Sequence, residues 1–310
     1  MPRLAGKTAI VVGAGQSPGE GMGNGRATAL LFAREGAKVL AVDHRMESAQ
    51  ETTALVTREG GTCVPFAADV TKEAALKAAV AEAMKLWSRI DVLHNNVGVS
   101  LAGGDASPTE ITEEAFDRVN AINLRGTIMA CKHVIPIMRK QQSGSIINIS
   151  SVAALSANYP TVAYKTTKAG MIAFTEQIAC QNAEYGVRAN AILPGLMNTP
   201  MAVDTRAREW GKPRAEVEAA RNARVPLRKR MGTGWDVAYA ALFLASDEAN
   251  FITGIGLLRA IVCSVRALIQ MVSMYEITGT PYDQAPSLGR AGVLQSGNAR
   301  RMEEALWISG

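Results

Sequence analysis

Tyr164 and Lys168 are the side chains of this sequence whose types and spacing best suit chemistry. They stand four residues apart, so a helix would place them on one face, one turn from each other. A phenol has an unperturbed pKa of about 10. A neighbouring ammonium group favours the phenolate and lowers that pKa toward working pH, which makes Tyr164 a candidate general acid and base.

A hydroxyl side chain, Ser151, precedes the tyrosine by thirteen residues, at the end of the apolar run 145–151. A hydroxyl at the C-terminal end of a strand can donate a hydrogen bond to a substrate oxygen. The three side chains together predict a catalytic group that transfers a proton to or from an alcohol. Because a Tyr-x-x-x-Lys pair alone is common on helix surfaces, this interpretation depends on the elements that would position it.

A glycine-rich loop, residues 13–25, follows the first apolar run and precedes a predicted helix at 26–35. Strand, glycine loop and helix form the geometry that holds a pyrophosphate, because glycine lets the backbone approach and the helix N-terminus offers free N–H groups. A flexible glycine loop is the alternative. Its place directly after the first strand favours the phosphate site.

The second predicted strand, residues 37–43, ends in Asp43. An acid at this place can accept hydrogen bonds from ribose hydroxyls and would repel a 2′-phosphate, which favours NAD over NADP. Arg45, two residues later, could soften that preference. An aspartate that caps the next helix is the alternative interpretation.

Strands and helices alternate along the chain up to residue 193. This alternation predicts an α/β fold in which a doubly wound parallel sheet of the Rossmann type is covered by helices on both faces. Ligands of such sheets sit at the C-terminal ends of the strands. The residues at those predicted ends are Gly13, Asp43, Asp69, Asn95, Ser151 and Pro194.

Composition bounds the class of protein. The chain has 310 residues, of which 48% are hydrophobic and 20% charged, as in ordinary globular proteins. It has no run of eighteen apolar residues and no signal-peptide pattern, so we expect no membrane span. Four scattered cysteines and three dispersed histidines predict reduced thiols, a cytoplasmic location and no metal site.

Basic residues concentrate in one segment. Residues 201–230 hold nine Lys and Arg but four Asp and Glu, a surplus equal to the net charge of +5 of the whole chain. Nucleic-acid-binding proteins more often spread a basic stripe with aromatic residues interleaved, so we expect no nucleic-acid partner. The segment is either a solvated helix face, which we prefer, or a site for an anionic substrate such as a carboxylate or phosphate.

These motifs, in this order and spacing, resemble the short-chain dehydrogenase/reductase family over about residues 4–256. The matching pieces are Gly23-Asn-Gly25, Asp69-Val70, Asn95-Asn-Val-Gly98, Asn123-Leu-Arg-Gly126, Ser151, Tyr164-Lys-Thr-Thr-Lys168, Pro194-Gly195 with Thr199, Leu244-Ala-Ser-Asp247 and Phe251-Ile-Thr-Gly254.

The resemblance implies roles for the candidate catalytic residues. Tyr164 would be the proton donor and acceptor, and Lys168 would lower its pKa and bind the nicotinamide ribose. Ser151, rather than the adjacent Ser150, would hold the substrate oxygen. Asn123 would hold a water molecule that links Lys168 to solvent.

The resemblance also implies a set of cofactor contacts. The glycines would line the phosphates, Asp69 and Val70 would flank adenine, Asn96 would contact the adjoining ribose, and Thr199 the carboxamide. The implied set is Gly13, Gly23, Asn24, Gly25, Asp43, Asp69, Val70, Asn96, Gly98, Tyr164, Lys168, Pro194, Gly195 and Thr199.

The sequence departs from the family pattern in three places. Val12 replaces the usual threonine and the glycine loop is about six residues longer, and Val97 replaces an alanine. After Gly254 the usual last strand with a Val-Asp-Gly-Gly ending is missing. We therefore expect one domain over 1–256, in which 200–230 form a substrate lid, and an atypical, diverged or frame-shifted tail over 257–310.

The resemblance implies a cytoplasmic NAD-dependent oxidoreductase that converts a small secondary alcohol and its ketone, as a homo-oligomeric dimer or tetramer. The charge argument above leaves an anionic substrate as one of its two interpretations. One alternative is an NADP-dependent reductase of 3-oxoacyl thioesters. Another is a nucleotide-binding regulator that has lost catalysis.

Overall fold

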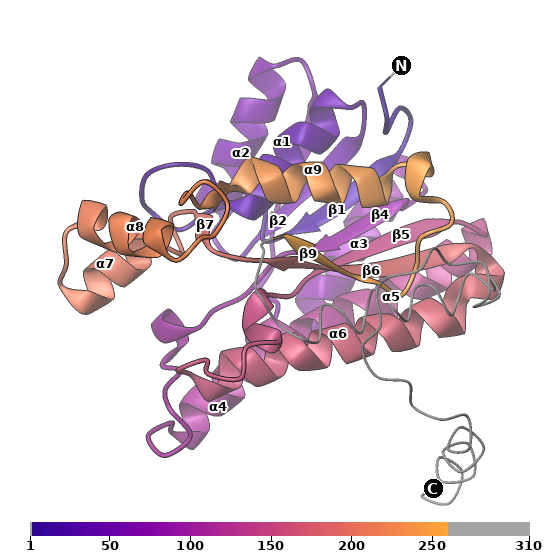
Figure 1. The fold of residues 1–310 in the computed structure, drawn as a ribbon. Coiled ribbons are helices and arrows are strands. Elements are labelled where there is room, and N and C mark those ends of the chain that lie inside the picture. The colour runs from indigo at the N-terminus through magenta and orange to yellow at the C-terminus, as the bar shows by residue number, and fades with distance from the viewer. Residues whose placement is uncertain (1, 260–310) are drawn as a thin grey trace, which may run out of the picture. The chain divides into compact units, whose positions relative to one another are not determined.

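The structure is a computed structural model, and it describes residues 2–259 (Figure 1). Its main sheet has seven parallel strands in the order β3-β2-β1-β4-β5-β6-β9. The strands are β1 (Thr8–Val12), β2 (Lys38–Asp43), β3 (Thr62–Ala67), β4 (Val92–Asn95), β5 (Gly144–Ile149), β6 (Val187–Pro194) and β9 (Gly256–Arg259). The order reverses between β1 and β4, which creates the crevice where ligands of such sheets bind.

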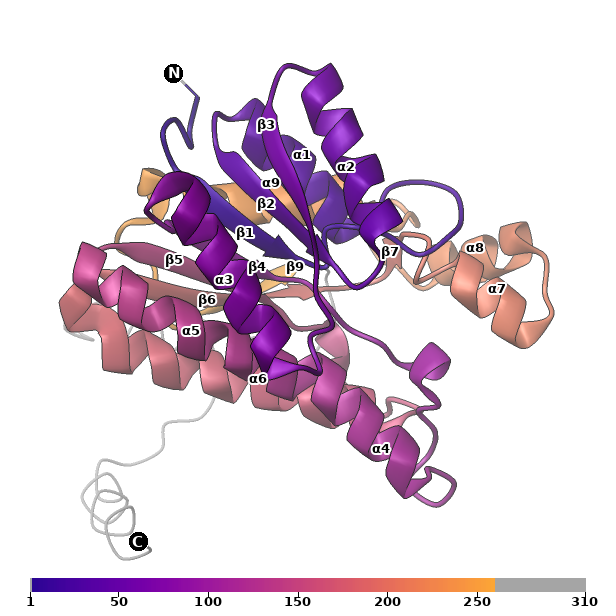
Figure 2. The same ribbon diagram turned by 180° about the vertical axis from the view of Figure 1, so that it is seen from behind.

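Helices cover both faces of the sheet (Figures 1 and 2). On one face lie α1 (Asn24–Arg34), α2 (Met46–Arg58) and α9 (Gly234–Ala245), and on the other lie α3 (Glu73–Trp87), α5 (Gly126–Gln141) and α6 (Val162–Asn182). The remaining helices are α4 (Glu113–Asn120), α7 (Asp204–Trp210) and α8 (Arg214–Ala223). The predicted α/β fold with a doubly wound parallel sheet is confirmed.

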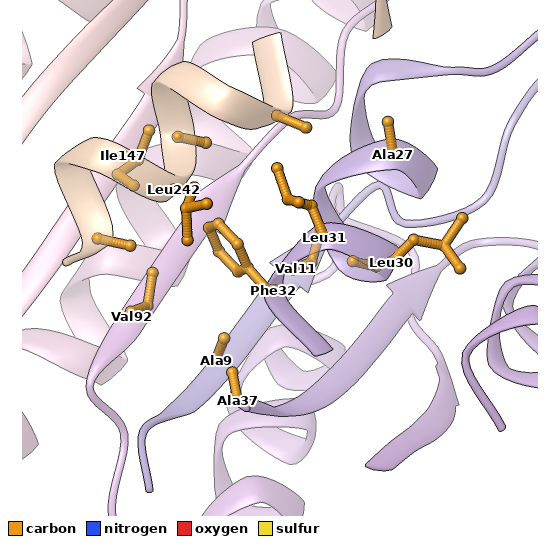
Figure 3. Packing of buried hydrophobic residues seen from close by; sticks show 14 of the residues in the cluster. Ala9, Val11, Ala27, Leu30, Leu31, Phe32, Ala37, Val92, Ile147 and Leu242 are labelled. Carbon is orange, nitrogen blue, oxygen red and sulfur yellow. The ribbon is translucent and has the colours of Figure 1, made fainter. Parts of the chain in front are cut away.

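The core divides into two layers because strand side chains alternate between faces. In β1, Ala9 and Val11 belong to the cluster under α1 and α9, whereas Ile10 and Val12 belong to the cluster under α3 and α5. Both faces are covered, so the strand reads as a continuous apolar run. Figure 3 shows the fully buried ring of Phe32 on α1, packed in the first cluster.

The helical region predicted from Thr112 to residue 138 proves to be composite. Thr112 caps α4, since its Oγ1 accepts a hydrogen bond of 3.2 Å from the N–H of Ala115. A π-helical turn, Ala121–Arg125, then joins α4 to α5. Such single π turns occur frequently at functional sites, and this one contains Asn123.

The last strand forms although its usual sequence motif is missing. Strand β9 pairs in parallel with β6, with Gly256 opposite Ala191 and Arg259 opposite Pro194. It therefore begins at the residue where we placed the domain boundary. Residues 260–310, most of the predicted tail, lie outside the described residues, and the division into domain and tail stays a prediction.

None of the helices within residues 2–259 has the length and hydropathy needed to cross a membrane.

Candidate active site

Helix α6 and the end of β5 bring the three predicted catalytic side chains together. Tyr164 and Lys168 lie one turn apart near the N-terminus of α6, and Nζ of Lys168 is 5.7 Å from the centre of the tyrosine ring. Ser151 follows β5 and forms a side-chain hydrogen bond with Tyr164. The grouping expected from the sequence is present at the C-terminal edge of the sheet.

Burial decides the protonation of the tyrosine. Loss of solvation and the neighbouring Tyr159, whose ring stacks at 5.8 Å, raise the pKa of Tyr164 to about 12. The hydrogen bond with Ser151 and the charges of Arg206 and Arg221 lower it by less. We expected a neighbouring ammonium group to lower the pKa of Tyr164. That prediction is wrong in direction, because desolvation outweighs the favourable charges.

The lysine is in the opposite situation. Lys168 is 2% exposed, and its Nζ donates a hydrogen bond of 2.7 Å to the carbonyl oxygen of Ile149. Burial lowers its pKa from 10.5 to about 7. Its ammonium form is thus the costly form, since no carboxylate within residues 2–259 forms an ion pair with it.

The neighbouring Ser150 does not compete for the catalytic role. Ser150 is 2% exposed, and its Oγ donates a hydrogen bond of 2.7 Å to the carbonyl oxygen of Lys168. It therefore ties β5 to α6. Ser151, whose Oγ accepts a bond of 3.1 Å from the N–H of Ala153, is the hydroxyl beside the phenol.

Asn123 connects two segments beside Lys168 through side-chain hydrogen bonds. Its Oδ1 accepts a hydrogen bond of 2.7 Å from the N–H of Val99, and its Nδ2 donates to the carbonyl oxygen of Val99 at 2.9 Å and to Thr167 at 3.2 Å. The amide thus joins the loop after β4 to α6. A Cβ at Gly98 would lie 3.1 Å from Nζ of Lys168, so glycine leaves the room that the lysine needs.

The glycine loop fits an anionic group at the start of α1. Gly13 has φ +83°, and a Cβ at Gly25 would lie 1.9 Å from the carbonyl oxygen of Gly13. No side chain caps α1 at Gly23 and its first turn holds no acid, so its first N–H groups and the positive dipole end remain available. These are the conditions under which a helix start binds phosphate.

Asp43 lies beside this loop. Its Oδ2 accepts a hydrogen bond of 3.0 Å from the N–H of Gly15, and its Oδ1 accepts one of 3.1 Å from the N–H of Arg45. Arg45, not Asp43, is the N-cap residue of α2, and no side chain caps that helix. The carboxylate therefore joins the glycine loop to the residue that begins α2. The guanidinium of Arg45 donates to the carbonyl oxygen of Gln16.

The other expected cofactor contacts lie around the same crevice. Asp69 follows β3, where its Oδ1 accepts hydrogen bonds of 2.9 and 2.8 Å from the N–H and hydroxyl of Thr71. Burial alone would raise the pKa of Asp69, but these bonds and the charge of Lys72 lower it below its ordinary value. Val70 packs against Gly126, at which a Cβ would lie 3.0 Å from the valine Cβ.

Two further expected contacts take part in holding loops. Nδ2 of Asn96 donates a hydrogen bond of 3.1 Å to the carbonyl oxygen of Gly13, which links β4 to the glycine loop. Oγ1 of Thr199 accepts a bond of 3.3 Å from the N–H of Ala202, just before the predicted lid. Pro194 ends β6, and Gly195 starts the turn that follows.

A cavity that is open to solvent lies between the glycine loop, the loop after β4 and α7. Its lining residues are Ser17, Gly98, Val99, Ser100, Leu101, Ala102, Met201, Thr205 and Arg206. Because Gly98 borders both this cavity and Nζ of Lys168, the cavity lies next to Lys168.

The extra residues of the glycine loop reach the predicted lid. The N–H of Glu20 donates a hydrogen bond of 3.3 Å to Oδ1 of Asp204 on α7, and Arg208 donates one of 3.2 Å to the carbonyl oxygen of Pro18. Glu20 also lies 3.6 Å from the guanidinium of Arg214 on α8. The insertion therefore contacts the segment predicted to be a lid, which its sequence did not indicate.

Sequence reasoning also missed Asp105. This aspartate is 5% exposed, and its two carboxylate oxygens accept hydrogen bonds of 2.9 Å from the N–H groups of Ala163 and Tyr164. It therefore caps α6 at the turn that carries Tyr164. The cap comes from a loop almost sixty residues away, so the local pattern before α6 could not reveal it.

Comparison with known proteins agrees with this geometry. A family model described as enoyl-(acyl carrier protein) reductase matches residues 20–258. The 3-oxoacyl-[acyl-carrier-protein] reductase FabG of Thermotoga maritima is 36% identical over 254 residues, covering 81% of this chain and 95% of that protein. The 2-(R)-hydroxypropyl-CoM dehydrogenase of Xanthobacter autotrophicus is 36% identical over 253 residues, covering 81% and 96%.

Solved structures give the same result. A crystal structure described as a candidate short-chain dehydrogenase/reductase from Burkholderia xenovorans has a TM-score of 0.76 and 40% identity, covering 84% of this chain and 97% of that chain. Sequence identity at this level over 84% of the chain shows common family membership and not only a shared fold. The chain belongs to the short-chain dehydrogenase/reductase family and is an NAD(P)-dependent oxidoreductase that acts on alcohol and carbonyl groups.

Proposed function

We propose that this enzyme interconverts a small secondary alcohol and its ketone, with Tyr164 as the group that moves the proton. The observation that supports the assignment is the Tyr164 phenol beside both Ser151 and Lys168, next to an open cavity. When bound, the nicotinamide cofactor supplies or accepts the hydride. The chain's own residues orient the substrate and handle the proton.

In the direction of reduction, Tyr164 is ready to donate. With a pKa of about 12 its phenol is protonated at neutral pH, and the Ser151 hydroxyl holds the substrate oxygen beside it. As the proton leaves, a negative charge develops on the phenol oxygen. A protonated Lys168 one turn away stabilises that charge, and general acid catalysis of this kind contributes typically about 10²- to 10⁴-fold.

In the direction of oxidation, Tyr164 must first lose its proton. Since burial raises its pKa, the phenolate is scarce at neutral pH and becomes commoner as pH rises. Hence the protein's own groups favour ketone reduction at neutral pH and alcohol oxidation at alkaline pH.

We propose NAD rather than NADP as the cofactor. The support is Asp43, a carboxylate at the end of β2 that accepts a hydrogen bond from the N–H of Gly15 in the glycine loop. At this place it would accept hydrogen bonds from ribose hydroxyls and repel a 2′-phosphate. The similarity to a protein named 3-oxoacyl-[acyl-carrier-protein] reductase keeps an NADP-dependent thioester reductase as the second hypothesis.

The test is steady-state reduction of a panel of ketones and one 3-oxoacyl thioester, followed by nicotinamide absorbance with NADH and then with NADPH. We expect kcat/KM for ketones with NADH to exceed that with NADPH by at least about tenfold, the value of one charge–charge repulsion of about 1.4 kcal/mol. Preference for NADPH together with the thioester would establish the second hypothesis. A catalytically silent regulator would bind the cofactor and reduce nothing.

We further propose that the enzyme acts in the cytoplasm as a dimer or tetramer. The free thiols of Cys63, Cys131 and Cys180 suit a reducing compartment. The large side chains of Tyr239 and Phe251, 56% and 102% exposed, suit burial against a second copy. Light scattering of the purified chain measures the oligomeric state, and a monomer would contradict that part of the proposal.

A further inference from the structure

Two arginines of the predicted lid have no acidic partner among the described residues. Arg206 on α7 lines the cavity next to the catalytic group, and Arg221 on α8 is buried at 9% exposure. Within residues 2–259 neither forms an ion pair with a carboxylate. The side-chain hydrogen bonds they make are one of 3.1 Å from Arg206 to the carbonyl oxygen of Ala202 and one of 3.4 Å from Arg221 to Sδ of Met231.

Three of the four acids of the lid are paired with other residues, and the fourth, Glu209, is exposed. Asp204 and Glu218 both pair with Arg214, and Glu216 pairs with Lys212 at 2.5 Å. A guanidinium carries five N–H donors, so most donors of Arg206 and Arg221 have no protein partner within residues 2–259. A buried charge without a partner is costly, and such sites persist where a ligand supplies the missing charge.

Electrostatic effects locate both arginines near the reacting group. The charges of Arg206 and Arg221 lower the pKa of Tyr164, against the larger effect of burial. Burial, together with the charge of Arg206, lowers the pKa of Arg221 to about 10. The charges of the two guanidinium groups therefore act on one another and on the Tyr164 phenol, and Arg206 also lines the cavity.

We propose that Arg206 and Arg221 form a binding subsite for an anionic oxoacid group, such as a carboxylate, sulfonate or phosphate, that the substrate carries a few bonds from its reacting carbonyl. The proposal rests on the proposed function, because it assigns the substrate class of the same site. Guanidinium groups suit this role since they bind planar oxoanions through paired hydrogen bonds and stay charged when half-buried.

The test compares each methyl ketone that bears a terminal carboxylate with its own methyl ester, which removes the charge and keeps the carbonyl. Chains of two to four methylene groups between the two functions cover the unknown spacing. We expect the acid to exceed the ester in kcat/KM. In the Arg206→Gln and Arg221→Gln variants we expect that ratio to fall by about 10- to 100-fold, the value of a hydrogen bond to a charged group.

Two further variants sharpen the result. Arg206→Lys keeps the charge but not the paired donors, so it should retain part of the acid preference. Arg230→Gln removes an exposed charge of the same lid segment and should leave the ratio unchanged. Thermal unfolding of each variant confirms that it is folded. Matching sulfonate and phosphate ketones show which oxoanion the subsite prefers.

Equal values for acid and ester in the parent enzyme would overturn the subsite. So would an equal loss for both substrates in Arg206→Gln, which would mean that the arginine acts only through Tyr164. If neither ketone is reduced, the proposed function fails instead, and calorimetric titration with pentane-1-sulfonate then decides the subsite. Binding that weakens in Arg206→Gln would support it, and no binding would refute it.

Discussion

Replacing Lys168 by methionine should change how the stability of the folded protein depends on pH. The lysine is 2% exposed, and burial lowers its pKa from 10.5 in a free side chain to about 7. Between these two pH values the unfolded chain binds a proton that the folded chain does not, so the free energy of unfolding rises with pH. Methionine has a similar length and nothing to titrate.

The size of the effect follows from the two pKa values. Each pKa unit corresponds to about 1.4 kcal/mol, so the full cost of the charge is about 5 kcal/mol. That cost is present in full below pH 7, decreases by about 1.4 kcal/mol for each pH unit above it, and vanishes above pH 10.5. Between pH 6 and pH 9 the cost therefore falls by about 3 kcal/mol.

The substitution also has a cost of its own. The carbonyl oxygen of Ile149 loses its 2.7 Å hydrogen bond from Nζ, which destabilises the variant by about 1–3 kcal/mol at every pH. We therefore expect Lys168→Met to be more stable than the parent protein at pH 6, by about 2–4 kcal/mol, and close to it at pH 9. The change in this difference with pH is the informative quantity, because the constant cost cancels.

Urea unfolding followed by circular dichroism at pH 6, 7, 8 and 9, without added cofactor, measures both curves. Lys140→Met, at an exposed position of α5, is the matched control and should follow the parent protein. Parallel curves for the parent protein and Lys168→Met would refute the reasoning, since they would show that the buried amine keeps its ordinary pKa.

Three other predictions concern the surroundings of this pair. Asp105→Ala should lower the free energy of unfolding by about 2 kcal/mol in urea titrations, because the carboxylate caps two amides at the start of α6, and it should lower kcat as Tyr164 loses its position. Gly25→Ala should weaken NADH binding at least about tenfold in fluorescence titrations, since the new Cβ would lie 1.9 Å from the carbonyl oxygen of Gly13; an unchanged Kd would show that the loop has room to adjust. For alcohol oxidation, kcat should rise with pH between 7 and 10, by up to about tenfold per unit, because the pKa of Tyr164 lies near 12; a flat profile would mean that its deprotonation does not limit the rate.

The parts of the site that could be predicted are those that local rules determine. Tyr164 and Lys168 meet because helical spacing places them one turn apart, and Ser151 joins them because parallel strands end at the same edge. The fold followed from the alternation of apolar runs and amphipathic helices. The choice of Ser151 over Ser150 rested on spacing, and the hydrogen bond of Ser150 to the backbone of Lys168 supplies its physical reason.

The parts that could not be predicted depend on contacts between distant segments or on burial. Asp105 caps α6 from another loop, and the insertion after Gly15 contacts α7. The predicted direction of the Tyr164 pKa shift was wrong, because the sequence shows the neighbouring charge but not the desolvation that outweighs it. Strand β9 forms because its backbone pairs with β6, which requires no particular ending motif.

The basic segment 201–230 shows the same limit at the level of function. Charge counting could not separate a solvated helix face from an anion site. Most of its charged groups prove to be exposed or paired, as Lys212 is with Glu216. Arg206 differs because it lines the cavity, and Arg221 differs because it is buried.

The central claim is that Tyr164 transfers the proton, and the Tyr164→Phe variant tests it most directly. Phenylalanine keeps the ring, including its stacking on Tyr159, and removes the hydroxyl alone. We expect NADH to bind with nearly the same Kd in fluorescence titrations, while kcat for ketone reduction falls by about 10²- to 10⁴-fold. A variant that binds the cofactor and reduces ketones at the parent rate would contradict the account.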